Sequence, residues 1–181
     1  MPFCFKGYVC CLFATLTCTS AQTSRAELLV ELSSSPADLS QLSLGETVTI
    51  DVALSGLTAN DELELLAATI TFEGDLLGAS VITPGPILPD PLDDPLDFLT
   101  VEDVGIADAV FLTFGTESSD RIGQNGVFFS FMVTPQDFGA GALELSFVDA
   151  LQYNPADPFD PIVPSISAGA PLNFQVVPEP S

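Results

Sequence analysis

Apolar and polar residues alternate along the chain from Ala26 onward. Residues 47–54 show the pattern most clearly, because Val48, Ile50, Val52 and Leu54 fall on one face. The residues between them are polar or small. Such alternation is typical of a strand that buries one face, so the pattern predicts a half-buried strand here.

The same alternation recurs through the rest of the chain. The apolar positions of these further runs are Leu28, Val30 and Leu32; Leu66, Ala68, Ile70 and Phe72; Val110, Leu112 and Phe114; Phe129, Phe131 and Val133; Leu143, Leu145 and Phe147; and Phe174 and Val176. We predict one cooperative core that includes Val48, Ile50, Val52, Ile70, Phe72, Leu112, Phe129, Phe131, Leu145 and Phe147.

Glycine-containing segments separate these runs. We expect turns at residues 44–46, 73–75, 124–126 and 139–141, where glycine tolerates positive φ. No window carries a long helical stripe. Many short alternating strands divided by turns indicate an all-β sandwich.

Two proline-rich segments do not fit a strand. Residues 83–97 combine five prolines with four aspartates and are expected to run over the surface. Residues 154–164 have proline at every third position, a spacing that would stack the prolines on one face of a polyproline II helix. Both segments are interpreted as stiff, solvated connections, with binding loops as the alternative.

Residues 1–21 have the organisation of a secretory signal peptide. Lys6 supplies a positive charge, an apolar run follows it, and small residues precede a cleavage site after Ala21. All four cysteines lie within this segment, so the mature chain, from residue 22 onward, has none. Disulfides, thiolate metal sites and a cysteine nucleophile are thereby excluded from the mature chain.

The chain is strongly acidic, with a formal net charge of −22 that becomes −23 when Lys6 is removed with the signal peptide. Such a surface repels nucleic acid and anionic lipid. It attracts divalent cations or suits a salty medium, and we interpret it as a solvated acidic surface.

The mature chain also lacks histidine and lysine. A Ser-His-Asp triad, a histidine base and a Schiff-base lysine are therefore unavailable, and no phosphate-binding glycine motif is present. A carboxylate pair remains as a catalytic device, but chance alone produces such pairs among 25 acids. We predict that the protein is not an enzyme.

Sugar binding is an alternative for this fold class. Tryptophan is absent, and Tyr153 is the one tyrosine of the mature chain. Sugar sites are built around aromatic platforms. We expect the loop residues Phe98, Phe138 and Phe159 to act as lids over the ends of the sandwich rather than as platforms.

Calcium is the one cofactor that the composition suggests. Hard cations take several oxygen ligands, and Asp90, Asp93, Asp94 and Asp97 lie together in the first proline-rich segment. Asp157 and Asp160 are a second candidate set. Neither matches an EF-hand pattern, so calcium is an open expectation and no other cofactor is expected.

Four stretches resemble cohesin domains. In residues 44–52 a glycine and an acidic residue precede an alternating strand, residues 66–81 are similar to the next cohesin element, and residues 125–133 and 141–149 resemble two late strands. The resemblance covers most of residues 26–177, and we expect a cohesin-like domain over residues 22–177. It implies a nine-stranded jelly-roll β-sandwich related to carbohydrate-binding modules and a function of docking dockerins, although no dockerin-contacting residues can be matched.

The end of the sequence resembles the start of a PEP-CTERM sorting signal, a tag on exported proteins of Gram-negative bacteria that make extracellular matrix. The motif is Val177, Pro178, Glu179, Pro180 and Ser181. The apolar helix and basic cluster of a complete signal do not follow, so we expect a truncated or frame-shifted sorting signal, with a proline-rich end of a secreted protein as the alternative. No stretch of the chain as given is expected to span a membrane.

These features predict a secreted, non-catalytic, cohesin-like module at the cell surface or in extracellular matrix. Its expected partner is a protein or a surface polysaccharide. A carbohydrate-binding module and a purely structural matrix protein are the two alternatives.

Overall fold

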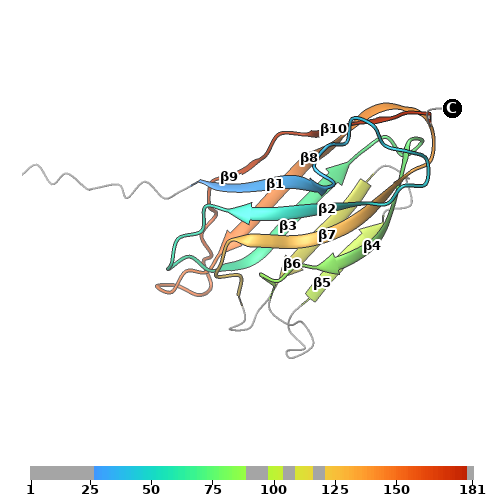
Figure 1. The fold of residues 1–181 in the computed structure, drawn as a ribbon. Coiled ribbons are helices and arrows are strands. Elements are labelled where there is room, and N and C mark those ends of the chain that lie inside the picture. Colours follow the sequence, from blue (N-terminus) through green and yellow to red (C-terminus); the bar gives the residue numbers. More distant parts are fainter. Residues whose placement is uncertain (1–26, 89–97, 104–108, 116–120, 179–181) are drawn as a thin grey trace, which may run out of the picture.

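The fold consists of two five-stranded, mainly antiparallel sheets packed face to face (Figure 1). The computed structural model describes residues 27–88, 98–103, 109–115 and 121–178. The strands are β1 (Leu28–Ser35), β2 (Val48–Ser55), β3 (Leu63–Thr71), β4 (Leu77–Pro84), β5 (Phe98–Asp103), β6 (Ala109–Gly115), β7 (Gly126–Pro135), β8 (Gly139–Gln152), β9 (Ile166–Ala168) and β10 (Leu172–Val176). The all-β sandwich that the sequence predicts is confirmed.

The strand order is β4-β7-β2-β1-β9 in one sheet and β10-β8-β3-β6-β5 in the other. The described residues thus contain ten strands, where nine were expected. β9 is three residues long and pairs in parallel with the start of β1. Because that pairing joins segments far apart in the sequence, no local alternation indicates it.

The core lies between the sheets and is built from the in-phase positions. In β2, Val48, Ile50, Val52 and Leu54 are at most 1% exposed. They face the apolar side of the second sheet, and each fully buried large side chain contributes about 1.5–3 kcal/mol through removal from water. From the second sheet the core includes Leu63, Leu66, Ile70, Val110, Leu112 and Phe114.

Strand β7 carries three buried phenylalanines, two of them adjacent. Phe128, Phe129 and Phe131 are at most 1% exposed, although alternation should turn Phe128 outward. The register with β2 shifts between Val52 and Ala53, which leaves Phe128 as an extra residue. Its ring packs edge-on against Phe129, with centroids 4.5 Å apart.

Three of the expected turns occur between strands, and the fourth is wrong. Residues 139–141 belong to β8, where Gly141 pairs with Phe174 of β10. A Cβ at Gly141 would overlap the Glu73 carboxylate and the Phe174 ring. These glycines therefore permit a close approach of neighbouring groups, and the chain turns just before them instead.

The two proline-rich segments also differ from expectation. The first gives Thr83 and Pro84 to β4, and the structure describes it only as far as residue 88. The second is not a polyproline II helix, because it folds into two successive turns, closed by Asp157 N–H to Asn154 O at 3.2 Å and Asp160 N–H to Asp157 O at 3.0 Å. A polyproline II helix has no such internal hydrogen bonds.

Candidate docking surface

Phe147, Thr69 and Phe111 lie side by side on the outer face of the β10-β8-β3-β6-β5 sheet. Thr69 in β3 is the register partner of both Phe147 in β8 and Phe111 in β6. Directly opposite side chains have Cβ atoms about 4.5–5.5 Å apart. Phe147 is 52% exposed and Phe111 37%, whereas Thr69 between them is only 8% exposed. We call these three residues the aromatic row.

Pairing with core residues fixes the outward direction of this row. Ile70, the neighbour of Thr69, is fully buried and pairs with buried Val110 of β6. Because successive side chains of a strand point to opposite faces, Thr69 and Phe111 must point away from the core. Large exposed aromatic side chains side by side on one face are typical of an interaction surface.

The prediction that Phe147 belongs to the core is wrong. Between Thr69 and Ile70 the register with β8 shifts, so that Thr69 pairs with Phe147 but Ile70 pairs with Leu145. Ser146 is the extra residue of this bulge, and it reverses the phase of β8. Leu145, also predicted in the core, is partly buried and packs against it.

Rows of short or acidic side chains flank the aromatic row. One row consists of the paired residues Asp149, Ala67 and Thr113, and the other of Glu144, Thr71 and Ala109. The side chains next to the two rings are therefore mostly short, and both acidic residues of these rows belong to β8. An apolar centre with charged residues at its edge is the usual anatomy of a protein–protein interface.

The outer face of the opposite sheet is more polar. Where β2 pairs with β7, Asp51 accepts a hydrogen bond from the Ser130 hydroxyl at 2.5 Å, and Thr49 pairs with Met132. Among the residues described, β1, β2, β7 and β9 carry no exposed large hydrophobic side chain. The two faces therefore differ, and the aromatic row distinguishes the one formed by β8, β3 and β6.

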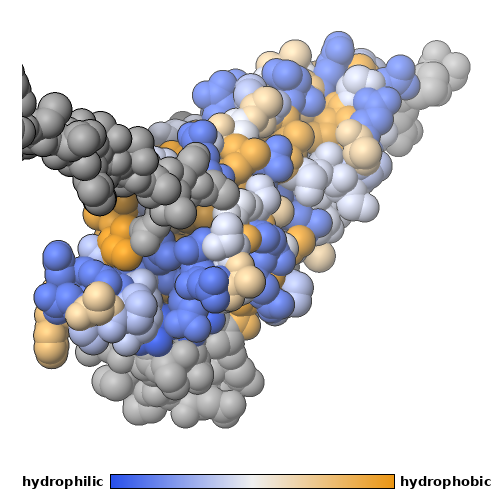
Figure 2. Space-filling model, turned by 90° about the vertical axis from the view of Figure 1, so that its left-hand side faces the viewer, coloured by the Kyte–Doolittle hydropathy of each residue, from blue (hydrophilic) through white to orange (hydrophobic). Residues whose placement is uncertain are grey.

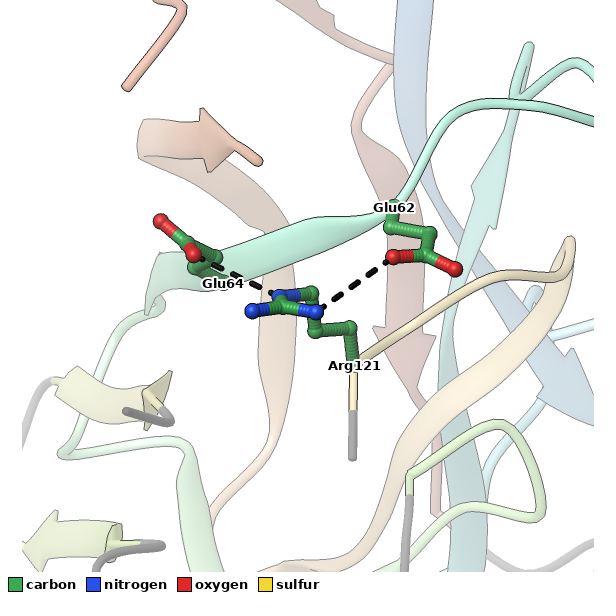
Figure 3. A network of polar contacts seen from close by, with 3 residues as sticks. All are labelled: Glu62, Glu64 and Arg121. Atoms are coloured by element: carbon green, nitrogen blue, oxygen red, sulfur yellow. Dashed lines mark hydrogen bonds and ion pairs between the residues drawn. The ribbon is translucent and has the colours of Figure 1, made fainter. Parts of the chain in front are cut away.

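Arg121 holds together a group of polar residues at one end of the sandwich. Its Nε lies 3.3 Å from Glu64 Oε1 and its Nη1 lies 3.6 Å from Glu62 Oε2 (Figure 3). The guanidinium also stacks over the Tyr153 ring, 3.6 Å from its centroid. Cation–π stacking of this kind adds to the two ion pairs.

This arrangement bears on sugar binding. Tyr153 is partly buried, and Arg121 covers one face of its ring. A sugar platform needs an open aromatic face. The face of Tyr153 that Arg121 covers is therefore closed to a ligand.

The loop phenylalanines are not all lids. Phe138 is 47% exposed and Phe159 is 97% exposed, so the expectation that they cover the ends of the sandwich is wrong. A side chain that covers the core packs against it and is therefore largely buried itself. The backbone of Phe98 begins β5, and its side chain lies outside the described residues.

The calcium candidates of the first proline-rich segment, Asp90, Asp93, Asp94 and Asp97, all lie outside the described residues. Asp157 and Asp160 are exposed and occupy the two turns after β8. Within the described ranges, no three histidine, cysteine, aspartate or glutamate residues gather as metal ligands would.

Of the predicted processing residues, Val177 and Pro178 are described, and the Val177 N–H donates to Leu42 O at 2.9 Å. Ala21, Glu179, Pro180 and Ser181 lie outside the described residues. Among the residues that the structure describes, no helix has the length and apolar character needed to cross a membrane.

The sequence interpretation did not single out Phe111 and Thr69 as candidate binding residues. Phe111 stands between Val110 and Leu112, which the alternation assigns to the core. A large aromatic residue at an outward position of a half-buried strand was the available signal, because polar residues are usual there.

These features define a β-sandwich with one aromatic outer face, and its fold is that of cohesins. The seventh ScaB type I cohesin from Pseudobacteroides cellulosolvens is similar to this chain with a TM-score of 0.64 and 14% identity, over 86% of this chain and 95% of the cohesin. The jelly-roll β-sandwich predicted from the sequence is thereby confirmed.

Two further solved structures are similar. The type I cohesin of the Coh-OlpA-Doc918 complex from Clostridium thermocellum gives a TM-score of 0.61 at 11% identity, over 83% of this chain and 99% of that one. A non-cellulosomal cohesin from Archaeoglobus fulgidus gives 0.59 at 12%, over 85% and 94%. No protein-family model and no curated protein sequence matches the chain.

Proposed function

We propose that the chain is a secreted, non-catalytic docking module that binds a partner protein through the outer face of the β10-β8-β3-β6-β5 sheet. The observation that carries this proposal is the aromatic row, in which Phe147 and Phe111 flank Thr69 and remain open to solvent. Aromatic side chains are enriched among residues that dominate binding energy.

The cohesin fold supports a docking role. Several of the similar structures are complexes of a cohesin with a dockerin. A fold alone does not determine a function, so the proposal for this chain rests on its surface. The fold adds that similar sandwiches bind a partner protein.

The charge of the chain specifies the partner's chemistry. Asp149 and Glu144 flank the aromatic row, and the net charge of the whole chain is −22. Complementary potentials steer two proteins together and suppress wrong pairings. The partner should therefore present an apolar patch rimmed by lysine and arginine.

The test is capture followed by quantitative binding. The chain from residue 22 serves as bait for extracellular proteins of the producing organism, and each captured protein is purified and titrated by calorimetry. Phe111→Ser combined with Phe147→Ser should weaken binding at least about tenfold. Phe138→Ser, an exposed phenylalanine outside the row, is the matched control and should change affinity less than about twofold.

Other outcomes would replace the proposal. Equal affinities of the double variant and the control would remove the aromatic row from the interface. Binding to one polysaccharide on a glycan array, lost on Tyr153→Ala, would favour the carbohydrate-binding alternative. If neither a protein nor a glycan binds, the structural role in matrix becomes the better explanation.

The proposed site of action is the cell surface or extracellular matrix of a Gram-negative bacterium. The support is the signal-peptide pattern of residues 1–21 and the motif Val177-Pro178-Glu179-Pro180-Ser181. Immunodetection of the protein on intact cells and in culture medium tests this location, and confinement to the cytoplasm would contradict it.

A further inference from the structure

The connection between β8 and β9 presents the most exposed large hydrophobic side chains of the described residues. Phe159 is 97% exposed and Val163 is 72% exposed, compared with 52% for Phe147. We call residues 154–164 the proline loop. A ring left almost wholly in water gains none of the roughly 25 cal/mol per Å² that burial supplies, so its burial by a partner would be favourable.

Hydrogen bonds fix the conformation of the proline loop. The Asn154 side chain spans it, donating from Nδ2 to Asp160 O at 3.0 Å and accepting at Oδ1 from the Ala156 N–H at 3.1 Å. Ile162 closes the base through two backbone hydrogen bonds with Gln152, of 2.8 and 2.9 Å. The loop is thus a closed unit on the end of β8.

The backbone at the tip is held as well. The Phe159 N–H donates to Asp157 Oδ1 at 3.2 Å. Pro158 precedes the ring and Pro161 follows it at two residues' distance, and proline restricts φ to about −65°. Because the backbone is ordered before binding, burial of the ring costs little conformational entropy.

The charge around Phe159 favours one kind of partner. Asp157 and Asp160 are exposed and lie two residues before and one residue after Phe159, and the end of the sandwich that carries the loop shows many hydrophilic side chains among smaller apolar patches (Figure 2). A second copy of this chain would bring the same acids against them at a net charge of −22 each. Like charges at an interface are costly, so a different, basic protein fits better.

A polysaccharide fits this loop less well. Sugar sites combine an aromatic platform with polar groups in a concave site, whereas Phe159 stands at the tip of a turn, almost wholly exposed. A protruding aromatic side chain on an ordered loop fits a pocket on a protein surface instead.

We propose that the proline loop is a second docking site, in which Phe159 inserts into an apolar pocket of a partner protein rimmed by lysine and arginine. The loop belongs to a different part of the fold from the aromatic row, since it begins where β8 ends. It can therefore engage a separate protein or a separate region of the same protein.

The experiment places the photoreactive analogue p-benzoylphenylalanine at position 159 of the chain from residue 22. Irradiation in the extracellular fraction of the producing organism should cross-link a protein that the analogue at position 138 does not capture. The cross-linked peptide should lie in an apolar pocket with cationic residues at its rim. That protein is then purified and titrated against the unlabelled chain.

The titration decides the proposal. Phe159→Ala should weaken binding at least about tenfold, and Phe138→Ala should leave it unchanged. Asn154→Ala, which keeps the ring but frees the loop, should weaken it by a smaller factor. Asp157→Asn with Asp160→Asn should reduce the dependence of affinity on salt.

Three results would overturn it. They are the absence of a cross-link specific to position 159, a cross-linked protein whose affinity Phe159→Ala does not change, and polysaccharide binding that depends on Phe159. The Phe111→Ser and Phe147→Ser variant separates the two sites, because it should leave the cross-link at position 159 intact.

Discussion

Phe147 of β8 lies opposite Thr69 of β3 at the last pair before the register between these strands shifts. Beyond the shift, Ile70 pairs with Leu145, and Ser146 is left over. The shift reverses the phase of β8, so that Leu143 on one side of it and Ala150 on the other are both fully buried. One extra residue thus places an aromatic ring on the outer face of the sheet.

This geometry predicts that substitution costs much more stability at one of two phenylalanines that the sequence pattern treats alike. Phe131→Ala should lower the free energy of unfolding by about 3–5 kcal/mol, because it empties a buried site. Phe147→Ala should lower it by no more than about 0.5 kcal/mol, since much of that ring is already in water. Urea unfolding of both variants measures the difference.

Far-UV circular dichroism provides the control that both variants keep the sandwich. A cost below about 1 kcal/mol for Phe131→Ala would show that β7 is assigned in the wrong phase. A cost above about 2 kcal/mol for Phe147→Ala would show that the ring belongs to the core after all.

The regular parts of the fold were predictable from alternation. Val48, Ile50, Val52 and Leu54 repeat without interruption, and all four are buried as expected. Alternation fails where a strand contains an extra residue, as at Ser146. A bulge is a property of the pairing between two strands, so the sequence of one strand does not reveal it.

The candidate surface was less predictable than the core. Burial follows from local pattern, but an exposed row requires knowledge of which strands are neighbours. Phe111 and Phe147 are 36 positions apart in the sequence and lie on either side of Thr69 only because both β6 and β8 pair with β3. Phe159 was placed in a loop correctly, but its exposure depends on how the loop turns.

Gly56 should be far less replaceable than Gly45. Gly56 has a φ of +93°, and a Cβ there would overlap the backbone oxygen of Glu27. Gly45 has a φ of +75° but open space around it. We expect Gly56→Ala to lower the free energy of unfolding by at least about 2 kcal/mol and Gly45→Ala by about 1 kcal/mol.

Urea unfolding of the two alanine variants tests the difference. Equal costs would show that the backbone between β2 and β3 can move away from Glu27. Gly45→Asn is a useful third variant, because asparagine tolerates positive φ better than alanine, and it should cost less than Gly45→Ala.

Arg121 should stabilise the end of the sandwich through its ion pairs and its stacking. Its side chain is 17% exposed and that of Glu64 is 21% exposed. Exposed ion pairs contribute about 0.2–1 kcal/mol and cation–π contacts about 0.5–1 kcal/mol. Arg121→Gln should therefore lower the free energy of unfolding by about 1 kcal/mol.

Salt separates the contribution of the ion pairs from that of the stacking. The loss in free energy of unfolding caused by Arg121→Gln should be smaller in 1 M NaCl, where the Debye length is about 3 Å. Tyr153→Leu, which removes the ring but keeps both ion pairs, is the matched variant, and a double-mutant cycle measures the stacking alone. An unchanged free energy of unfolding for Arg121→Gln would contradict the structural role of this group.

The exported protein should begin at Gln22, directly after the expected cleavage site at Ala21. Small residues at Thr19 and Ala21 follow the apolar run, which is the arrangement that signal peptidase recognises. Intact-mass measurement and N-terminal sequencing of secreted material give the answer. Exported protein that retains Met1 would contradict a cleaved signal, whereas cleavage after Ala26 would only move the site.

The acidity of the chain should make its stability depend on salt. Repulsion among the excess of 23 negative charges on the mature chain, which lacks Lys6, destabilises the compact state, and added salt screens it. NaCl should therefore raise the melting temperature, by about 2–4 °C for each kcal/mol gained. A melting temperature that is flat or falls between 0.05 and 0.5 M NaCl would show that self-repulsion is unimportant.

Calcium distinguishes plain screening from a binding site in the first proline-rich segment. At matched ionic strength, screening alone predicts nearly equal stabilisation by NaCl and CaCl₂. A specific site predicts an additional, saturable rise that follows the ligand concentration. Asp93→Asn with Asp94→Asn should abolish that rise, because it removes two of the four candidate carboxylates.

The control for this variant is Asp157→Asn with Asp160→Asn, which removes the same amount of charge from the proline loop. Both double variants should gain stability from reduced repulsion in low salt. A site at Asp90, Asp93, Asp94 and Asp97 requires that only the first variant lose the calcium effect. If both double variants lose the stabilisation by calcium to the same extent, calcium is attracted diffusely to the acidic surface. Its effect would then depend on the total charge and not on a particular set of ligands.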